Sequence, residues 1–326
     1  MTVRRRDFIT LLGGTAVWPL AARAQQAAIP VIGFVRNTPL AVAAHLMAAF
    51  RQGLKETGFV EGENVAIEYY SAEGQVDRLP RVVSDMIRRP VVAIAANGIA
   101  ALAAKTATTT IPIVFATGGD PVEQGLVPSL NRPGGNVTGV NFFDGALGTK
   151  RLELLRQIMP KAALIGMLVN PNTTETEAER RDVQAAAQAI GQQLLIIDVS
   201  SEIDIALAFA TFVGRGAGAA LVGTGAFTFA NRAGLIAQAD HHALPTCHTP
   251  REAAEAGALM SYGTSIPDAY RQVGIYVGRI LKGEMPADLP LIRSTKFEFV
   301  INLKTAKAFG INIPPMLLAL ANEVIE

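Results

Sequence analysis

The chain has little cysteine, little net charge and no long apolar run after its first two dozen residues. Its 326 residues include one cysteine, Cys247, which excludes an intramolecular disulfide. We expect Cys247 to be a small buried apolar residue in a strand rather than a nucleophile. After residue 24 the longest apolar stretch, 91–104, is interrupted by Asn97-Gly98. This excludes a membrane-spanning helix there, which needs roughly 20 apolar residues, and predicts a soluble chain.

The charge of the chain is nearly balanced, with 29 basic and 28 acidic residues. Residues 1–24 hold four arginines and one aspartate, which leaves 25 basic and 27 acidic residues in the remainder. A nucleic-acid groove needs a clustered basic face, so we expect no nucleic-acid partner. The roughly 300 remaining residues exceed what one hydrophobic core usually holds, which predicts two lobes.

Motifs typical of catalysis and of metal binding are also lacking. There is no P-loop and no G-x-S-x-G elbow, and the G-x-G at residues 214–218 precedes a strand, which indicates a turn. His241-His242 and His248 lack the usual zinc spacings, and adjacent histidines on a helix point to different faces. We therefore expect no enzyme, no cofactor and no metal site.

The N-terminal segment has the features of a secretory signal peptide. Arg4-Arg5-Arg6 precedes a weakly apolar run, and Ala22-Arg23-Ala24 has the A-x-A form of a cleavage site. The run Arg5-Arg6-Asp7-Phe8-Ile9 resembles the core of twin-arginine signals, with the general export route as the alternative. We expect cleavage after Ala24 and a periplasmic location. The competing interpretation is a basic tail on a cytoplasmic protein. No cysteine near the cleavage site offers a lipid anchor.

Short apolar runs alternate with amphipathic helical patterns along the rest of the chain. The first half predicts strands at residues 30–35, 65–70, 91–96, 111–116 and 137–141, and helices at 42–54, 79–88 and 99–108. The second half predicts strands at 164–169, 194–199, 219–223 and 244–247, and helices at 173–191, 203–213 and 230–242. Right-handed crossovers turn each half into a parallel sheet with helices on both faces. The fold class is therefore α/β, with two doubly wound parallel-sheet lobes.

The last section of the chain continues this alternation. It predicts a strand at 259–262, a helix at 266–281, a strand at 297–301 and a short helix at 317–325. Ser265 is the expected cap of the helix at 266–281. The buried stripe of that helix is expected to consist of Tyr270, Val273, Val277 and Ile280.

Ligands of open parallel sheets bind outside the carboxyl ends of the strands, so the residues that follow each strand are the candidate site. They are small polar residues and glycines at helix N-termini, which suit a carboxylate, and aromatic residues, which suit an apolar ligand group. The alternative is that they are ordinary caps and turns. The candidate ligand-binding residues are Asn37, Thr38, Asn97, Gly98, Thr117, Gly118, Asp120, Phe142, Asn170, Asn172, Gly225, Phe227 and Tyr262.

Several runs resemble the ABC-transporter substrate-binding family that includes tryptophan- and tyrosine-binding receptors of the type I periplasmic fold. The resemblance covers essentially the whole chain. Its runs are Arg4-Arg5-Arg6-Asp7-Phe8-Ile9, Ile32-Gly33-Phe34, Gly118-Gly119-Asp120-Pro121-Val122, residues 130–139, Leu259-Met260-Ser261-Tyr262-Gly263, residues 296–306 and Ile313-Pro314-Pro315.

The resemblance implies a cleft between two lobes joined by three crossings. It implies a first lobe of residues 25–143 plus 258–287 and a second lobe of residues 144–257 plus 288–326, after the signal at 1–24. Many relatives carry an Asp-Pro-Phe-Phe-like run where this chain has Gly225-Ala226-Phe227-Thr228-Phe229. The missing acid removes a possible partner for an amino group, so an aromatic acid competes with an aromatic or branched amino acid as the expected ligand. Asp120 remains as an acid near the cleft or serves as a helix cap.

The resemblance further implies a monomeric solute-binding component of an ABC importer, with a small-molecule ligand and an inner-membrane permease as partners. Ligand binding would close the lobes as a Venus flytrap closes. The competing function is an exported ligand-sensing partner of a membrane receptor.

Overall fold

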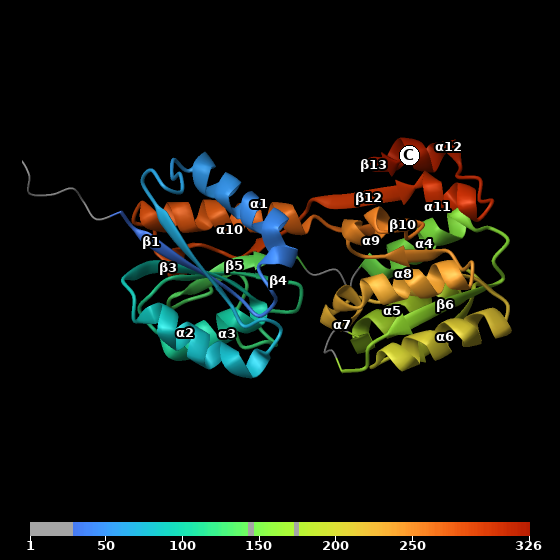
Figure 1. Ribbon diagram of the computed structural model, residues 1–326, viewed down its shortest axis with the longest axis horizontal. Helices are drawn as coiled ribbons and strands as arrows, with labels where there is room; N and C mark the ends of the chain where they lie inside the picture. The colour runs from blue at the N-terminus through green and yellow to red at the C-terminus, as the bar shows by residue number, and fades with distance from the viewer. Residues whose placement is uncertain (1–28, 143–146, 173–175) are drawn as a thin grey trace, which may run out of the picture.

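The computed structural model describes residues 29–142, 147–172 and 176–326, and these form two α/β lobes that lie side by side (Figure 1). The predicted signal at residues 1–24 and its cleavage site after Ala24 lie outside the described residues. Both lobes are built as expected from a sheet covered by helices on both faces. Among the described helices, none has the length and apolar character needed to cross a membrane.

The first lobe contains a six-stranded parallel sheet in the order β11-β5-β4-β3-β1-β2. Its strands are β1 (Val31–Arg36), β2 (Ala66–Ser71), β3 (Val91–Asn97), β4 (Ile113–Thr117), β5 (Val137–Asn141) and β11 (Ile292–Arg293). Its helices are α1 (Ala44–Glu56), α2 (Leu79–Ile87), α3 (Gly98–Ala107) and α10 (Ile266–Leu281), with short 3-10 turns at Ala41–Ala43, Val76–Arg78 and Pro286–Asp288.

Apolar clusters fill both faces of this sheet. Ile32 and Phe34 of β1 pack with α1 and α10, whereas Val35 of the same strand packs with α2 and α3. The continuous apolar strands in the sequence follow from this burial on both faces.

The second lobe contains a seven-stranded sheet in the order β13-β12-β10-β9-β8-β6-β7. Its strands are β6 (Leu164–Val169), β7 (Gln193–Asp198), β8 (Ala217–Val222), β9 (Thr246–His248), β10 (Met260–Thr264), β12 (Phe297–Asn302) and β13 (Glu323–Ile325). Its helices are α4 (Gly148–Ile158), α5 (Thr176–Ala189), α6 (Glu202–Gly214), α7 (Ala226–Ala230), α8 (Arg232–His241), α9 (Arg251–Glu255), α11 (Leu303–Ala308) and α12 (Pro315–Leu320). Five of its strands are parallel, and β12 and β13 run parallel to each other but antiparallel to those five.

Two of the three crossings between the lobes lie at different residues from those expected, and the expected boundary between residues 143 and 144 lies outside the described residues. The strand β10 pairs with β9 and β12 of the second sheet, so the chain enters the first lobe between Thr264 and Ile266 rather than at residue 258. The strand β11 pairs with β5 of the first sheet, so the return follows Arg293 rather than residue 287. Both lobe boundaries are therefore set by pairing between strands that lie far apart in the chain.

Helix α10 confirms the local predictions for its segment. It spans the predicted residues, its N-cap Ser265 accepts a hydrogen bond from the backbone N–H of Asp268, and all four residues of the predicted stripe are buried. The predicted helix at 317–325 is wrong in its second half. It ends at Leu320, and Glu323–Ile325 pairs with β12 as an edge strand, because Val324 and Ile325 find a partner there. The helices α4, α7, α9 and α11 were not predicted.

Candidate functional site

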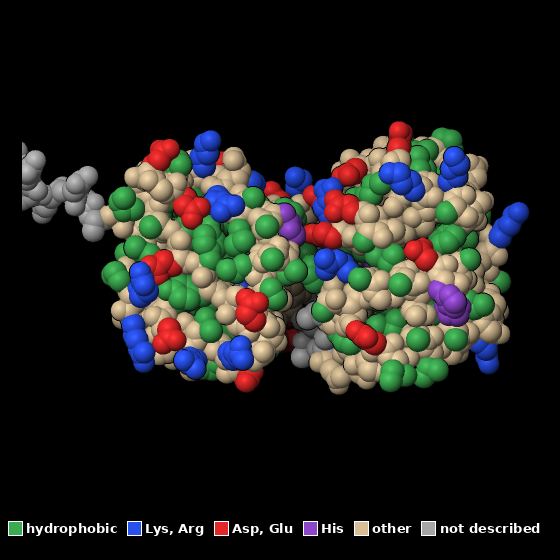
Figure 2. All heavy atoms as spheres, viewed as in Figure 1, with side chains coloured by type: hydrophobic (Ala, Val, Ile, Leu, Met, Phe, Trp, Pro, Cys, Tyr) green, Lys and Arg blue, Asp and Glu red, His purple; other side chains and the backbone are tan. Residues whose placement is uncertain are grey.

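The topology places the carboxyl ends of the parallel strands of each sheet at the junction of the lobes. The chain leaves the first lobe after β5 and again after β11, and it leaves the second lobe after β10. The carboxyl ends of the parallel strands of both sheets therefore face the junction, where the molecular surface is indented (Figure 2). This is the expected position for a ligand of two open parallel sheets.

In the first lobe the structure brings the predicted residues of β1 and β3 together. The backbone N–H of Asn37 donates to Oδ1 of Asn97 at 3.1 Å, and Nδ2 of Asn97 donates to Oδ1 of Asn37 at 2.7 Å. Gly98, next in the chain, begins helix α3. A Cβ atom at Gly98 would lie 2.7 Å from Oγ1 of Thr117, so glycine is required by this close approach.

The loop after β4 is organised by its own polar groups. Oγ1 of Thr117 donates to Gln124 at 2.8 Å, and Gly118 lies against the ring of Phe142. Oδ1 of Asp120 accepts from the backbone N–H groups of Val122 at 2.7 Å and Glu123 at 3.2 Å. Asp120 therefore caps the turn at residues 121–125, and the helix that its alternative role as a helix cap requires is absent from these described residues.

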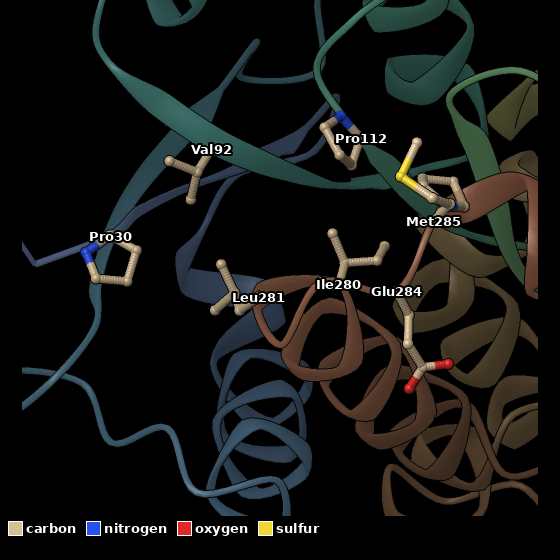
Figure 3. Close-up of a pocket in the computed structure, with 9 residues that line it drawn as sticks. Pro30, Val92, Pro112, Ile280, Leu281, Glu284 and Met285 are labelled. Atoms are coloured by element: carbon tan, nitrogen blue, oxygen red, sulfur yellow. The ribbon is translucent and has the colours of Figure 1, made fainter.

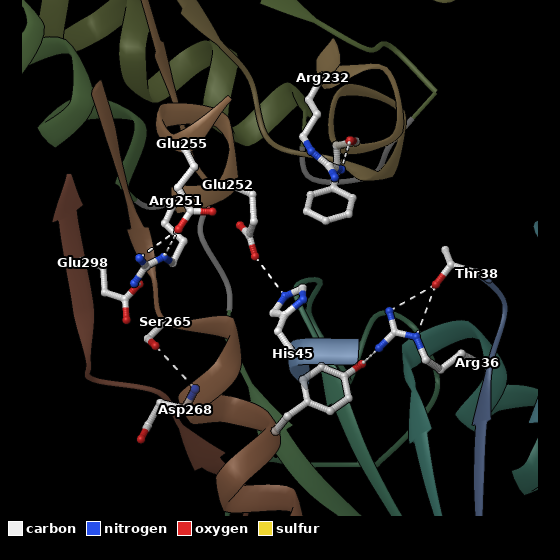
Figure 4. A network of polar contacts seen from close by, with 12 residues as sticks. Arg36, Thr38, His45, Arg232, Arg251, Glu252, Glu255, Ser265, Asp268 and Glu298 are labelled. Carbon is white, nitrogen blue, oxygen red and sulfur yellow. Dashed lines mark hydrogen bonds and ion pairs between the residues drawn. The ribbon is translucent and has the colours of Figure 1, made fainter. Parts of the chain in front are cut away.

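The most distinctive group of the first lobe is Arg36, at the carboxyl end of β1, which the sequence prediction passed over. Arg36 is 8% exposed to solvent. Nη1 donates to the hydroxyl of Tyr270 at 2.8 Å, and Nε and Nη2 donate to Oγ1 of Thr38 at 3.2 and 3.1 Å (Figure 4). Three of the five guanidinium N–H groups are thus used, all on neutral oxygens. Within the described residues Arg36 has no carboxylate partner.

A buried guanidinium without a carboxylate partner is suited to bind an anion, because its remaining N–H groups can form charge-assisted hydrogen bonds. The sequence signal was available: Arg36 stands at the carboxyl end of an otherwise apolar strand.

In the second lobe the predicted residues have mostly local roles. Asn170 accepts from the backbone N–H of Asn172 at 2.8 Å and donates to the carbonyl of Val199 at 3.0 Å, while Asn172 itself is exposed. Gly225 has φ +142° and is the N-cap of α7. This positive φ favours glycine.

The aromatic residues of the second lobe differ in their surroundings. Phe227 packs against the apolar cluster beneath α6 and α8. Tyr262 lies on β10, where it packs on the core of the second lobe beside Phe297 and Phe299. Phe227 and Tyr262 are both half-buried, and each packs on one side against the core of its own lobe.

A buried ion pair lies beside the loops that follow β8 and β9 in the second lobe. Arg151 of α4 and Glu179 of α5, both with 1% exposed side chains, form a salt bridge, and Arg151 also donates to Oγ1 of Thr249. Oε2 of Glu179 accepts from the backbone N–H of Thr224 at 2.9 Å and from its hydroxyl at 2.8 Å. Nε of Arg151 is buried without a partner among the described residues. The pair therefore ties the loops after β8 and β9 to helices α4 and α5.

A polar side-chain contact joins the two lobes directly. Nε2 of His45 in α1 lies 3.0 Å from Oε1 of Glu252 in α9 (Figure 4). Burial would raise the pKa of Glu252, but hydrogen bonds from His45 and from its own backbone N–H, with the positive charge of Arg232, leave that pKa below its ordinary value. Arg232 donates to the carbonyl of Phe229 at 3.2 Å and lies 4.9 Å from its ring centre.

Cys247 and His248 of β9 are fully enclosed. Burial raises the pKa of the Cys247 thiol to about 12, and burial with the nearby Arg151 lowers the pKa of His248 to about 3. Oγ1 of Thr246 lies 3.1 Å from Nε2 of His248. Cys247 is therefore the buried strand residue that the sequence predicted, and His248 is a neutral core residue.

Two hollows occur away from the strand ends of the first sheet. A groove of about 320 Å³ is lined by Pro30, Val92, Pro112 and the end of α10 (Figure 3), at the opposite, amino edge of that sheet. A cavity of about 10 Å³ lies under the second crossing, between Glu252 and Ile266. The larger groove is apolar and distant from Arg36, and the smaller cavity has room for about one water molecule.

Comparison with known proteins agrees with this architecture. A family model described as ABC transporter substrate binding protein matches residues 29–325. A tyrosine-binding protein of Clostridioides difficile (strain R20291) is 26% identical over 260 residues, which cover 79% of this chain and 74% of that protein. A conserved domain protein from Vibrio cholerae superposes with a TM-score of 0.80 at 25% identity, covering 91% of this chain and 99% of that one.

A third similar structure, from Streptococcus pneumonia, contains bound L-Trp. Its TM-score is 0.80 at 24% identity, and the match covers 91% of this chain and 99% of that one. At this identity the likeness supports the fold of two lobes.

Proposed function

The chain belongs to the ABC transporter substrate-binding protein family, and we propose that it is the exported, periplasmic receptor of an importer. Its ligand is a small molecule with a carboxylate, of the class of aromatic or branched amino acids and aromatic acids. The ligand binds between the lobes, which close on it by a hinge motion at the crossings. The closed monomer then delivers it to an inner-membrane permease, without chemical turnover.

The observation that carries the ligand class is the environment of Arg36. Tyr270 and Thr38 fix the guanidinium from two sides but leave its charge without a described counter-ion. A ligand carboxylate supplies that counter-ion and accepts from the remaining N–H groups. The neighbouring Asn37–Asn97 pair and the loop at Gly118 add polar groups and the ring of Phe142.

The relatives support the amino-acid part of this class. One relative is named for tyrosine binding, and one structural neighbour holds L-Trp. Both ligands combine a carboxylate with an aromatic ring.

A thermal-shift screen of the processed chain tests the proposal. The panel contains aromatic and branched amino acids, aromatic acids and small uncharged solutes. A ligand at 100 times its dissociation constant adds about 2.7 kcal/mol to the free energy of unfolding, which raises Tm visibly. We expect shifts from carboxylates and none from the uncharged solutes. A panel in which only uncharged solutes raise Tm would refute the ligand class.

Arg36→Met extends this test to the site. Truncating one partner of a buried charged hydrogen bond costs about 2–5 kcal/mol, so the affinity for a carboxylate ligand should fall at least about 30-fold. Arg51→Met is the matched control, because Arg51 pairs at the surface with Glu61. The control should bind as the wild type does.

A further inference from the structure

The segment Gly225–Phe229 carries no acid, so an amino group on the ligand needs another partner. Two acids near the junction are already engaged. Asp120 caps the turn that follows it, and Glu179 is enclosed by Arg151 and Thr224. Glu252 differs from both of them, since its side-chain partner, His45, belongs to the other lobe.

Glu252 lies in the first turn of α9, and its side chain is 17% exposed. Apart from its own backbone N–H, its hydrogen-bond partner among the described residues is His45 of the first lobe, whose side chain is 42% exposed. A half-exposed imidazole therefore covers an otherwise enclosed carboxylate. Figure 4 shows this pair in one close-up with Arg36 of the first lobe and Arg232 of the second.

We propose that Glu252 is the specificity-determining acid that binds the ammonium group of the ligand. In the present structure the imidazole of His45 occupies the place of that ammonium group. This rests on the proposed function and narrows its ligand to an α-amino acid. Arg36 of the first lobe binds the carboxylate and Glu252 of the second lobe binds the ammonium group. A zwitterion then connects the lobes through both of its charges and stabilises the closed form.

The exchange at Glu252 conserves its interactions. One nitrogen donor, the imidazole of His45, is replaced by another, the ligand ammonium, so the carboxylate is never left buried without a partner. Arg232 keeps a positive charge near Glu252 throughout, which favours its ionised form.

Matched ligand pairs test the assignment by isothermal titration calorimetry. The pairs are L-phenylalanine with 3-phenylpropionate, L-tryptophan with 3-indolepropionate and L-leucine with 4-methylpentanoate, which differ only in the amino group. We expect the wild type to prefer the amino acid by at least about tenfold, the effect of one charged hydrogen bond. In Glu252→Gln the amino-acid affinity should fall about 10- to 100-fold, while the affinity for the analogue changes less than about threefold.

Two further variants separate a local effect from a general one. Glu255→Gln, on the same helix and paired with Arg251, should leave both affinities unchanged. His45→Ala should raise the amino-acid affinity, because it removes the competing imidazole.

Three results would overturn the assignment: a wild type without preference for the amine, an equal loss for both members of a pair in Glu252→Gln, or a lower amino-acid affinity in His45→Ala. Failure of both members of every pair to bind is a separate outcome, which overturns the proposed function and this assignment with it.

Discussion

Breaking the buried ion pair between Arg151 and Glu179 should destabilise the second lobe more than any surface substitution. Both side chains are 1% exposed, and Glu179 also accepts two hydrogen bonds from Thr224. Glu179→Gln removes the negative charge and leaves the guanidinium of Arg151 buried without a counter-ion. Removing one partner of such a pair costs about 3–5 kcal/mol.

The corresponding change in Tm is large. For a unit of 150–250 residues about 1 kcal/mol lowers Tm by about 2–4 °C, so we expect a decrease of about 6–20 °C. Far-UV circular dichroism is a suitable probe, since the one tryptophan of the chain, Trp18, lies in the predicted signal. Urea unfolding of the same proteins gives the free energies.

The control is Glu153→Gln, on the same helix as Arg151. Glu153 pairs with Lys150 at the surface, and its side chain is 53% exposed, so its loss should cost at most about 1 kcal/mol. The double variant Arg151→Met with Glu179→Leu should cost less than the sum of the single variants, because neither charge is then left alone. Equal losses in Glu179→Gln and Glu153→Gln, or additive losses in the double variant, would refute this reasoning.

Three further expectations follow from other parts of the structure. Gly53→Ala should lower the free energy of unfolding by about 1–3 kcal/mol or more in urea titrations, since its Cβ would lie 1.8 Å from the carbonyl oxygen of Arg271. Gly234→Ala, with open space around it, should leave the free energy of unfolding unchanged or raise it. A larger loss in Gly234→Ala than in Gly53→Ala would contradict the α1–α10 packing. Cys247 should react with a maleimide only in denaturant, because the thiol is buried with a pKa of about 12, and rapid native labelling at pH 8 would contradict its burial. The pKa of Glu252 is lowered on folding, so its contribution to stability is present above the unfolded pKa of about 4.5 and is lost as pH falls through the folded value. The difference in free energy of unfolding between wild type and Glu252→Gln should therefore shrink from pH 6 to pH 3. A difference that grows over this range would contradict the His45 contact.

Features that depend on residues close together in the chain were predictable from the sequence. The strands β5 and β6 have the predicted bounds, and α10 has its predicted cap and stripe, because strand apolarity, helical periodicity and capping are local properties. The pairing of β10 with β12 and of β11 with β5 joins residues that the sequence pattern does not connect. The lobe boundaries differed from expectation for that reason.

The candidate site divides in the same way. The rule that ligands bind at strand carboxyl ends identified Asn37, Asn97 and Thr117, and these residues do lie at one edge of the first sheet. It could not identify His45 and Glu252, which are helical residues 207 positions apart and meet only because the lobes do. It also could not show that Tyr262 packs on its own core, since that depends on the face of β10 that the helices cover.

A crystal structure of the processed chain with the tightest amino acid of the panel tests the central claim most directly. The account predicts closed lobes, with the ligand carboxylate within hydrogen-bond distance of Arg36. It is contradicted if the ligand lies away from the junction, or if Arg36 keeps only Tyr270 and Thr38 as partners.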